Sequence, residues 1–86
     1  MQKTDVEGEV RRFLIEHFFS GRADKLRDDG SLLGDVIDSA GILDLVIYLQ
    51  DRFAITVEDD EVTPGNLDTV HNLVAYVTGK LGVNNE

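Results

Sequence analysis

Three segments of the chain repeat apolar residues at the spacing of a single helix face, and this pattern limits the fold more than any other feature. Residues at i, i+3, i+4 and i+7 lie on one side of an α-helix, which can pack that side against other helices. The stripes are, in chain order, Val6, Val10, Phe13, Leu14, His17 and Phe18, then Ile42, Leu45, Val46, Leu49 and Phe53, then Val70, Leu73, Val74, Val77 and Leu81. No segment shows the strict alternation of a half-buried strand, so an all-α fold is expected.

Capping and chain-breaking residues set the expected limits of the first two helices. Gly21 follows the first stripe and is expected to end that helix. Asp38 precedes the second stripe and is a good N-cap for a helix that runs to about Phe53. The stretch between these helices is long for a bare connection, so a packed loop is expected. The apolar residues that should anchor this loop to the core are Leu26, Leu32, Leu33, Val36 and Ile37.

The second half of the chain predicts a short helical turn and a last long helix. The acidic segment from Asp59 to Val62 permits one turn of helix, which Pro64 is expected to close. The last helix should begin near Asp68 or Thr69, and Gly79 weakens its end. The expected architecture is a four-helix bundle of three longer helices and one short helix, with a long loop between the first two helices.

Length, charge and composition narrow the class of protein. The 86 residues suit a single domain, spanning 1–86. Seventeen acidic residues against eight basic ones give a net charge of −9, which disfavours nucleic-acid binding and favours basic patches on partner proteins. Cysteine is absent, which excludes disulfides and thiolate metal sites. With no leader and no apolar run of about 20 residues, a monomeric cytoplasmic protein without a membrane span is expected.

The acidic turn before the last helix does not fit a calcium-binding loop. In an EF-hand loop read from Asp59, Pro64 stands where glycine is required and Val70 stands where a glutamate closes the site. A solvated turn whose acids favour the start of a short helix explains these residues better. No metal site is therefore expected.

Ser39, within the stretch GDVIDSAGILDLV, admits three interpretations. Ser or Asp at a helix start usually caps it, which is worth about 1 kcal/mol. A nucleophilic serine needs a base, for which only His17 and His71 are available, and Ile37 stands where the nucleophile-elbow motif needs glycine. A hydrolase, and any enzyme, is therefore not expected. Attachment is the third interpretation, because the free N–H groups and dipole of a helix N-terminus favour a phosphodiester or a phosphate.

The second helix carries another apolar stripe beside its core face. Ala40, Leu43 and Ile47 follow the i, i+3, i+7 spacing. An exposed apolar strip with acidic borders, next to an accessible serine, is typical of a docking surface for basic partners. The pattern fits equally well an alternative in which loop residues 26–37 cover the strip. The acidic residues that flank the strip are Asp35, Asp38, Asp44 and Asp51.

These residues together resemble the acyl carrier protein family, the domains to which phosphopantetheine is attached. The resemblance covers nearly the whole chain and centres on IDSAGILDLVIYLQDRFAITVEDDEV, while LDTVHNLVAYV is similar to the family's last helix. Asp38 and Ser39 match the family's Asp-Ser pair, and Asp44 matches its acidic residue five places on. Further matching positions are Leu45, Val46, Leu49, Asp51, Phe53, Ile55, Val57, Thr69 and Val70.

Two positions beside the serine depart from the family pattern. Leu usually follows the serine, and an acidic or polar residue is common after it, whereas this chain has Ala40 and Gly41. Both changes are expected to thin the contact surface at the attachment point. The segment VTPGNL is slightly longer than in the members that serve fatty-acid synthesis, which resembles discrete carriers that work beside an adenylate-forming ligase.

The resemblance implies a carrier protein that works in fatty acid or secondary metabolite biosynthesis. Ser39, flanked by Asp38, would receive 4′-phosphopantetheine covalently from coenzyme A through a phosphopantetheinyl transferase. The thiol of this arm would hold an acyl or aminoacyl group as a thioester. Loading ligases or synthases with basic docking patches would then be the partners. The alternative is a small acidic helical interaction module in which Ser39 is only a helix cap.

Overall fold

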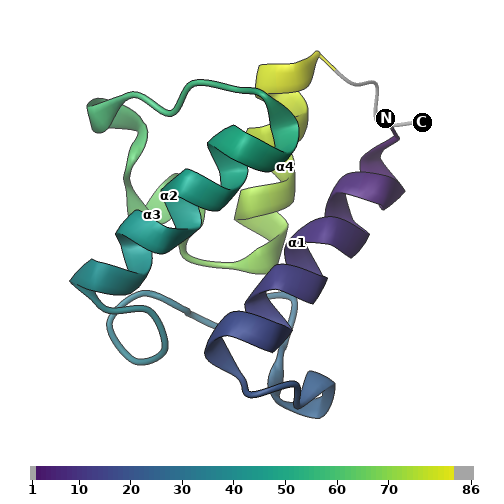
Figure 1. The fold of residues 1–86 in the computed structure, drawn as a ribbon, viewed down its shortest axis with the longest axis vertical. Helices are drawn as coiled ribbons and strands as arrows, with labels where there is room; N and C mark the ends of the chain where they lie inside the picture. The colour runs from purple at the N-terminus through teal and green to yellow at the C-terminus, as the bar shows by residue number, and fades with distance from the viewer. Residues whose placement is uncertain (1, 83–86) are drawn as a thin grey trace.

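The computed structural model describes residues 2–82, which form four α-helices and two short 3-10 turns. The elements in order are α1 (Lys3–Phe18), a 3-10 turn (Ala23–Lys25), α2 (Ser39–Phe53), a 3-10 turn (Asp59–Glu61), α3 (Pro64–Leu67) and α4 (Val70–Leu81). Helices α1 and α4 lie side by side, and the long first loop crosses one end of the bundle to reach α2 (Figure 1). The predicted all-α bundle, with three longer helices and one short one, is confirmed.

The predicted helix stripes form the core of the bundle. Each long helix buries at least three residues of its stripe completely or nearly so, and partly buried residues such as Phe13 and Ile42 pack around them. The loop anchors Leu26, Leu32 and Ile37 are also buried. The buried residues of the three long helices are Val6, Val10, Leu14, Gly41, Leu45, Leu49, Phe53, Val70, Leu73, Val74, Val77 and Thr78.

Two predicted boundaries differ from the structure. Helix α1 ends at Phe18, before Gly21, because Ser20 and Gly21 both adopt positive φ angles, of 53° and 80°, and turn the chain away. The segment Asp59–Glu61 forms a 3-10 turn as expected, but Pro64 begins α3 instead of closing a helix. The fixed φ of proline suits the first turn of a helix, where its missing N–H would have had no intrahelical partner.

One carboxylate, that of Asp68, ties the first loop to the junction of α3 and α4. Its oxygens accept hydrogen bonds from the Leu33 N–H at 2.9 Å, the Ser31 hydroxyl at 2.8 Å and the Leu32 N–H at 3.1 Å. These bonds, with Leu33 the largest contributor, lower the pKa of the Asp68 carboxyl. The loop therefore reaches α2 along a fixed path, which sets the position of the start of that helix.

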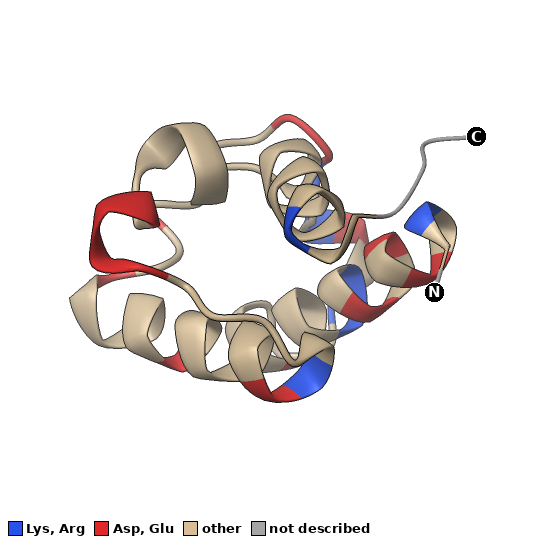
Figure 2. Ribbon diagram, turned by 90° about the horizontal axis from the view of Figure 1, so that it is seen from above, with Lys and Arg blue, Asp and Glu red and all other residues tan. Residues whose placement is uncertain are grey.

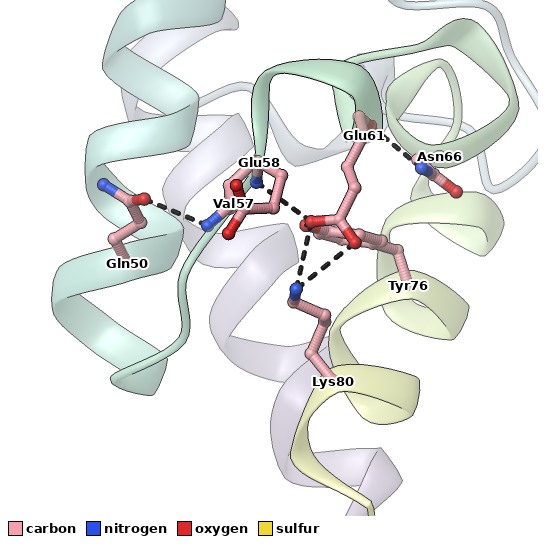
Figure 3. A network of polar contacts seen from close by, with 7 residues as sticks. All are labelled: Gln50, Val57, Glu58, Glu61, Asn66, Tyr76 and Lys80. Carbon is pink, nitrogen blue, oxygen red and sulfur yellow. Dashed lines mark hydrogen bonds and ion pairs between the residues drawn. The ribbon is translucent and has the colours of Figure 1, made fainter.

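A second polar network holds the segment after α2 against α4 (Figure 3). The Glu61 carboxylate accepts hydrogen bonds from the Glu58 N–H, Lys80 Nζ and the Tyr76 hydroxyl, at 2.9, 3.0 and 2.9 Å. The Glu58 N–H contributes most to a pKa of about 2 for Glu61, and burial raises the pKa of Tyr76. Gln50 on α2 accepts from the Val57 N–H at 3.0 Å, so the network also fixes the last turn of α2.

Candidate functional site

Ser39 is the first residue of α2, and its neighbour Asp38 makes the cap. The Asp38 carboxylate accepts a hydrogen bond from the Gly41 N–H at 2.8 Å, while Ser39 is exposed. The interpretation of Ser39 as the helix cap is therefore wrong, because Asp38 already satisfies one of the free N–H groups of the first turn. The Ser39 hydroxyl is left at the surface of a helix N-terminus, where the helix dipole favours negative charge.

Gly41 is buried at the point where the start of α2 meets the end of α1. A Cβ atom built there would lie 2.9 Å from Cε1 of Phe18 and 3.0 Å from Cγ2 of Ile37. Side chains this close to Gly41 leave no room for the acidic or polar residue that is common in the family. The expectation that Gly41 thins the contact surface is wrong, since Gly41 is buried, and of these two residues only Ala40 is exposed.

The second apolar stripe of α2 lies on the surface, with Ala40 exposed at its start. Leu43 has an exposed fraction of 65% and Ile47 of 55%, and they are the large hydrophobic residues exposed among residues 2–82. Residues 26–37 do not cover them. Single exposed apolar residues are ordinary, but Leu43 and Ile47 lie four residues apart on one helix face, which also begins with the exposed Ser39 and Ala40.

The four acidic residues expected around this stripe, Asp35, Asp38, Asp44 and Asp51, are all exposed. Their surroundings differ. The Asp38 carboxylate is engaged in the cap, and an Asp44 oxygen lies 3.0 Å from Nε2 of His17 on α1. Carboxylates also run without interruption along the 58–61 turn, which is drawn as a continuous red segment in Figure 2.

His17 is exposed, although it belongs to the apolar stripe expected to face the core. Its ring stacks on Phe13 with the ring centres 4.9 Å apart and meets the edge of Phe18, while Nε2 pairs with Asp44. The pairing was not foreseeable from spacing, because residues 17 and 44 meet only once the register of the two helices is fixed. Neither His17 nor the exposed His71 hydrogen-bonds Ser39 within residues 2–82, so the nucleophilic interpretation lacks its base.

The described residues carry neither a cluster of metal ligands nor a helix that could cross a membrane. Among residues 2–82, His, Asp and Glu side chains form no group of three or more that suits a metal ion. None of the helices in this part of the chain has the length and apolar character that crossing a bilayer requires.

No family model matches this chain. It is 30% identical over 73 residues to a probable acyl carrier protein, PigG, of Serratia sp., and the match covers 84% of each chain. It is 39% identical over 57 residues to the acyl carrier protein of Beutenbergia cavernae, covering 65% of this chain and 67% of that protein. The chain belongs to the acyl carrier protein family.

A third relative, the acyl carrier protein of Zymomonas mobilis, is 28% identical over 75 residues, which cover 86% of this chain and 92% of that protein. Acyl carrier proteins hold acyl groups, and that is the function of this chain. The relatives named here are carriers and not catalysts.

Proposed function

We propose that Ser39 is the residue to which 4′-phosphopantetheine is attached, with coenzyme A as the donor. The observation that carries the proposal is the exposed Ser39 hydroxyl at the first position of α2, with the cap supplied by Asp38. A phosphodiester at this position would lie at the positive end of the helix dipole, which favours a negative charge by about 0.3–1 kcal/mol on an exposed helix end. The residues present therefore fit the group.

The residues around Ser39 hold the hydroxyl accessible and its backbone fixed. Ala40 is small, and Gly41 lets the first turn of α2 seat against Phe18. The serine oxygen would form the bond to phosphorus, the adenosine 3′,5′-bisphosphate part of coenzyme A would leave, and the hydroxyl proton would pass to a base of the transferase. When bound, the arm supplies a thiol, which this cysteine-free chain lacks, to hold acyl or aminoacyl groups as thioesters.

The exposed stripe of Ala40, Leu43 and Ile47 is proposed as the docking face for the phosphopantetheinyl transferase and the loading or synthase enzymes. Its apolar area supplies contact, and its acidic border attracts a basic partner surface. The border consists of Asp35, Asp38, Asp44 and Asp51. Because Asp44 also contacts His17, a basic group of the partner must compete with the histidine for it.

Intact mass after enzymatic loading tests the attachment. The apo protein is incubated with coenzyme A, magnesium and a broad-specificity phosphopantetheinyl transferase, and a gain of one phosphopantetheinyl group is expected. The gain should vanish in Ser39→Ala and persist in Ser20→Gly, a control at another exposed serine whose positive φ glycine accepts readily. A gain that survives Ser39→Ala would place the arm on another residue and overturn the assignment. No gain in the wild-type protein would leave the interaction-module alternative in its place.

A further inference from the structure

A small cavity lies between the end of α1 and the first loop, and its lining is unusual for this chain. It has a volume of about 130 Å³, and Phe19, Leu32 and Val36 give it an apolar wall. Lys25 and Arg27 also line it, and no Asp or Glu does. In a chain with a net charge of −9, a cavity bordered by two cations and no carboxylate departs from the rest of the surface.

The two cations have no competing partner in the described structure. Neither Lys25 nor Arg27 takes part in an ion pair within residues 2–82. The adjacent Asp28 pairs with Arg11 on α1, so its charge is directed to another part of the molecule. A second cavity, between α1 and α4, has both acidic and basic side chains in its lining, so it does not favour a ligand of either charge. These side chains are Lys3, Glu7, Asp28 and His71.

The cavity lies close to Ser39 along the chain and in space. Val36 precedes Ser39 by three residues, so their Cα atoms are at most about 11 Å apart. On the other wall, Phe19 directly follows Phe18, whose ring covers Gly41 in the first turn of α2. An extended phosphopantetheine arm is longer than this separation.

We propose that this cavity receives the end of a short acyl group that carries a free carboxylate, a dicarboxylic acid held as its half-thioester on the arm at Ser39. The inference rests on the proposed attachment of the arm. The carboxylate would pair with Arg27 and Lys25, since a guanidinium binds a carboxylate through two parallel hydrogen bonds, and the methylene groups would contact Phe19 and Leu32. The volume of the cavity equals that of about four water molecules, which suits the few heavy atoms at the end of a short acyl group.

The test compares two cargoes of equal carbon number on the whole protein. ¹⁵N-labelled protein is loaded by the transferase from glutaryl or pentanoyl analogues of coenzyme A in which an amide replaces the labile thioester. The glutaryl form should shift the backbone amide signals of Phe19, Leu32 and Val36 relative to the pentanoyl form. These shifts should be lost in Arg27→Ala and Lys25→Ala and kept in Arg22→Ala, an exposed cation of the same loop outside the cavity lining.

The outcomes separate this proposal from the attachment itself. Loading is measured first by intact mass, and failure to load would overturn both proposals. A loaded protein whose glutaryl and pentanoyl forms shift these amides equally would overturn only the cargo proposal. Shifts that survive Arg27→Ala together with Lys25→Ala would do the same. Thermal unfolding of each variant checks that the fold is intact. An unchanged unfolding temperature is expected, because the side chains of Lys25 and Arg27 are exposed.

Discussion

The two faces of α2 both carry apolar residues, but one face is buried and the other is exposed. Leu45 and Leu49 have no exposed surface, whereas Leu43 and Ile47, on the same helix, are more than half exposed. The inward face is covered by α1, α4 and the first loop, and its burial stabilises the bundle. The outward face is covered by nothing within residues 2–82. Apolar character therefore supports folding on one side of this helix and remains exposed on the other, where we propose that partner enzymes dock.

The largest effect on stability is expected on the inward face. Leu49→Ala should reduce the free energy of unfolding by about 2–5 kcal/mol, because it removes buried methyl groups and leaves a cavity. Urea denaturation measures this loss. Leu43→Ala is the matched control, and its effect should stay within about 0.5 kcal/mol because the side chain is in water. Equal losses in the two variants would contradict the assignment of the faces.

A smaller loss is expected where α2 begins. Gly41→Ala places a methyl group against Phe18 and Ile37, and overpacking of this kind costs about 1–3 kcal/mol. The higher helix propensity of alanine offsets up to about 1 kcal/mol of this cost. Thermal unfolding should therefore show a net decrease of about 1 kcal/mol in the free energy of unfolding. Phe18→Leu should lower the cost of the alanine when the two changes are combined. An unchanged unfolding temperature in Gly41→Ala would show that the first turn is loosely packed.

The end of α2 should respond to pH through the Glu61 network. The pKa of Glu61 falls from 4.5 to about 2 on folding, so its contribution is complete above pH 4.5 and is lost as the pH falls toward 2. Thermal unfolding of the wild-type protein and Glu61→Gln should therefore differ most near neutral pH and converge at the acid end. Parallel pH profiles for the two proteins would contradict this linkage.

The smallest effect on stability is expected on the outward face, with a large effect on function. Ile47→Glu should change the free energy of unfolding by no more than about 0.5 kcal/mol, because the side chain is already exposed. The rate of loading by the transferase should nevertheless fall, since a charge replaces an apolar contact. Mass spectrometry over time measures this rate. A variant that loads normally would show that the outward face takes no part in docking to that enzyme.

The contrast between the two faces of α2 also explains which features of the structure could be predicted from the sequence. Helical spacing identified both stripes of α2, and Asp38 identified its start, because periodicity and capping are local properties of the chain. The spacing did not decide whether the first loop covers Leu43 and Ile47. Gly41 looked like a thinned surface until Phe18 was seen against it, and His17 met Asp44 only through the packing of α1 on α2. Such features depend on how helices are placed relative to one another, which spacing along the chain does not encode.

The Asp68 carboxylate also has a consequence for local opening. The carboxylate accepts hydrogen bonds from Ser31, Leu32 and Leu33. The backbone carbonyl of Asp68 also accepts a hydrogen bond from the Leu32 N–H, at 2.7 Å. Breaking the loop free from the α3–α4 junction therefore requires several hydrogen bonds to break at once. The first loop and this junction should open as one cooperative unit, with a shared protection factor against hydrogen exchange. The loop that leads to Ser39 would then be no more mobile than the junction that anchors it.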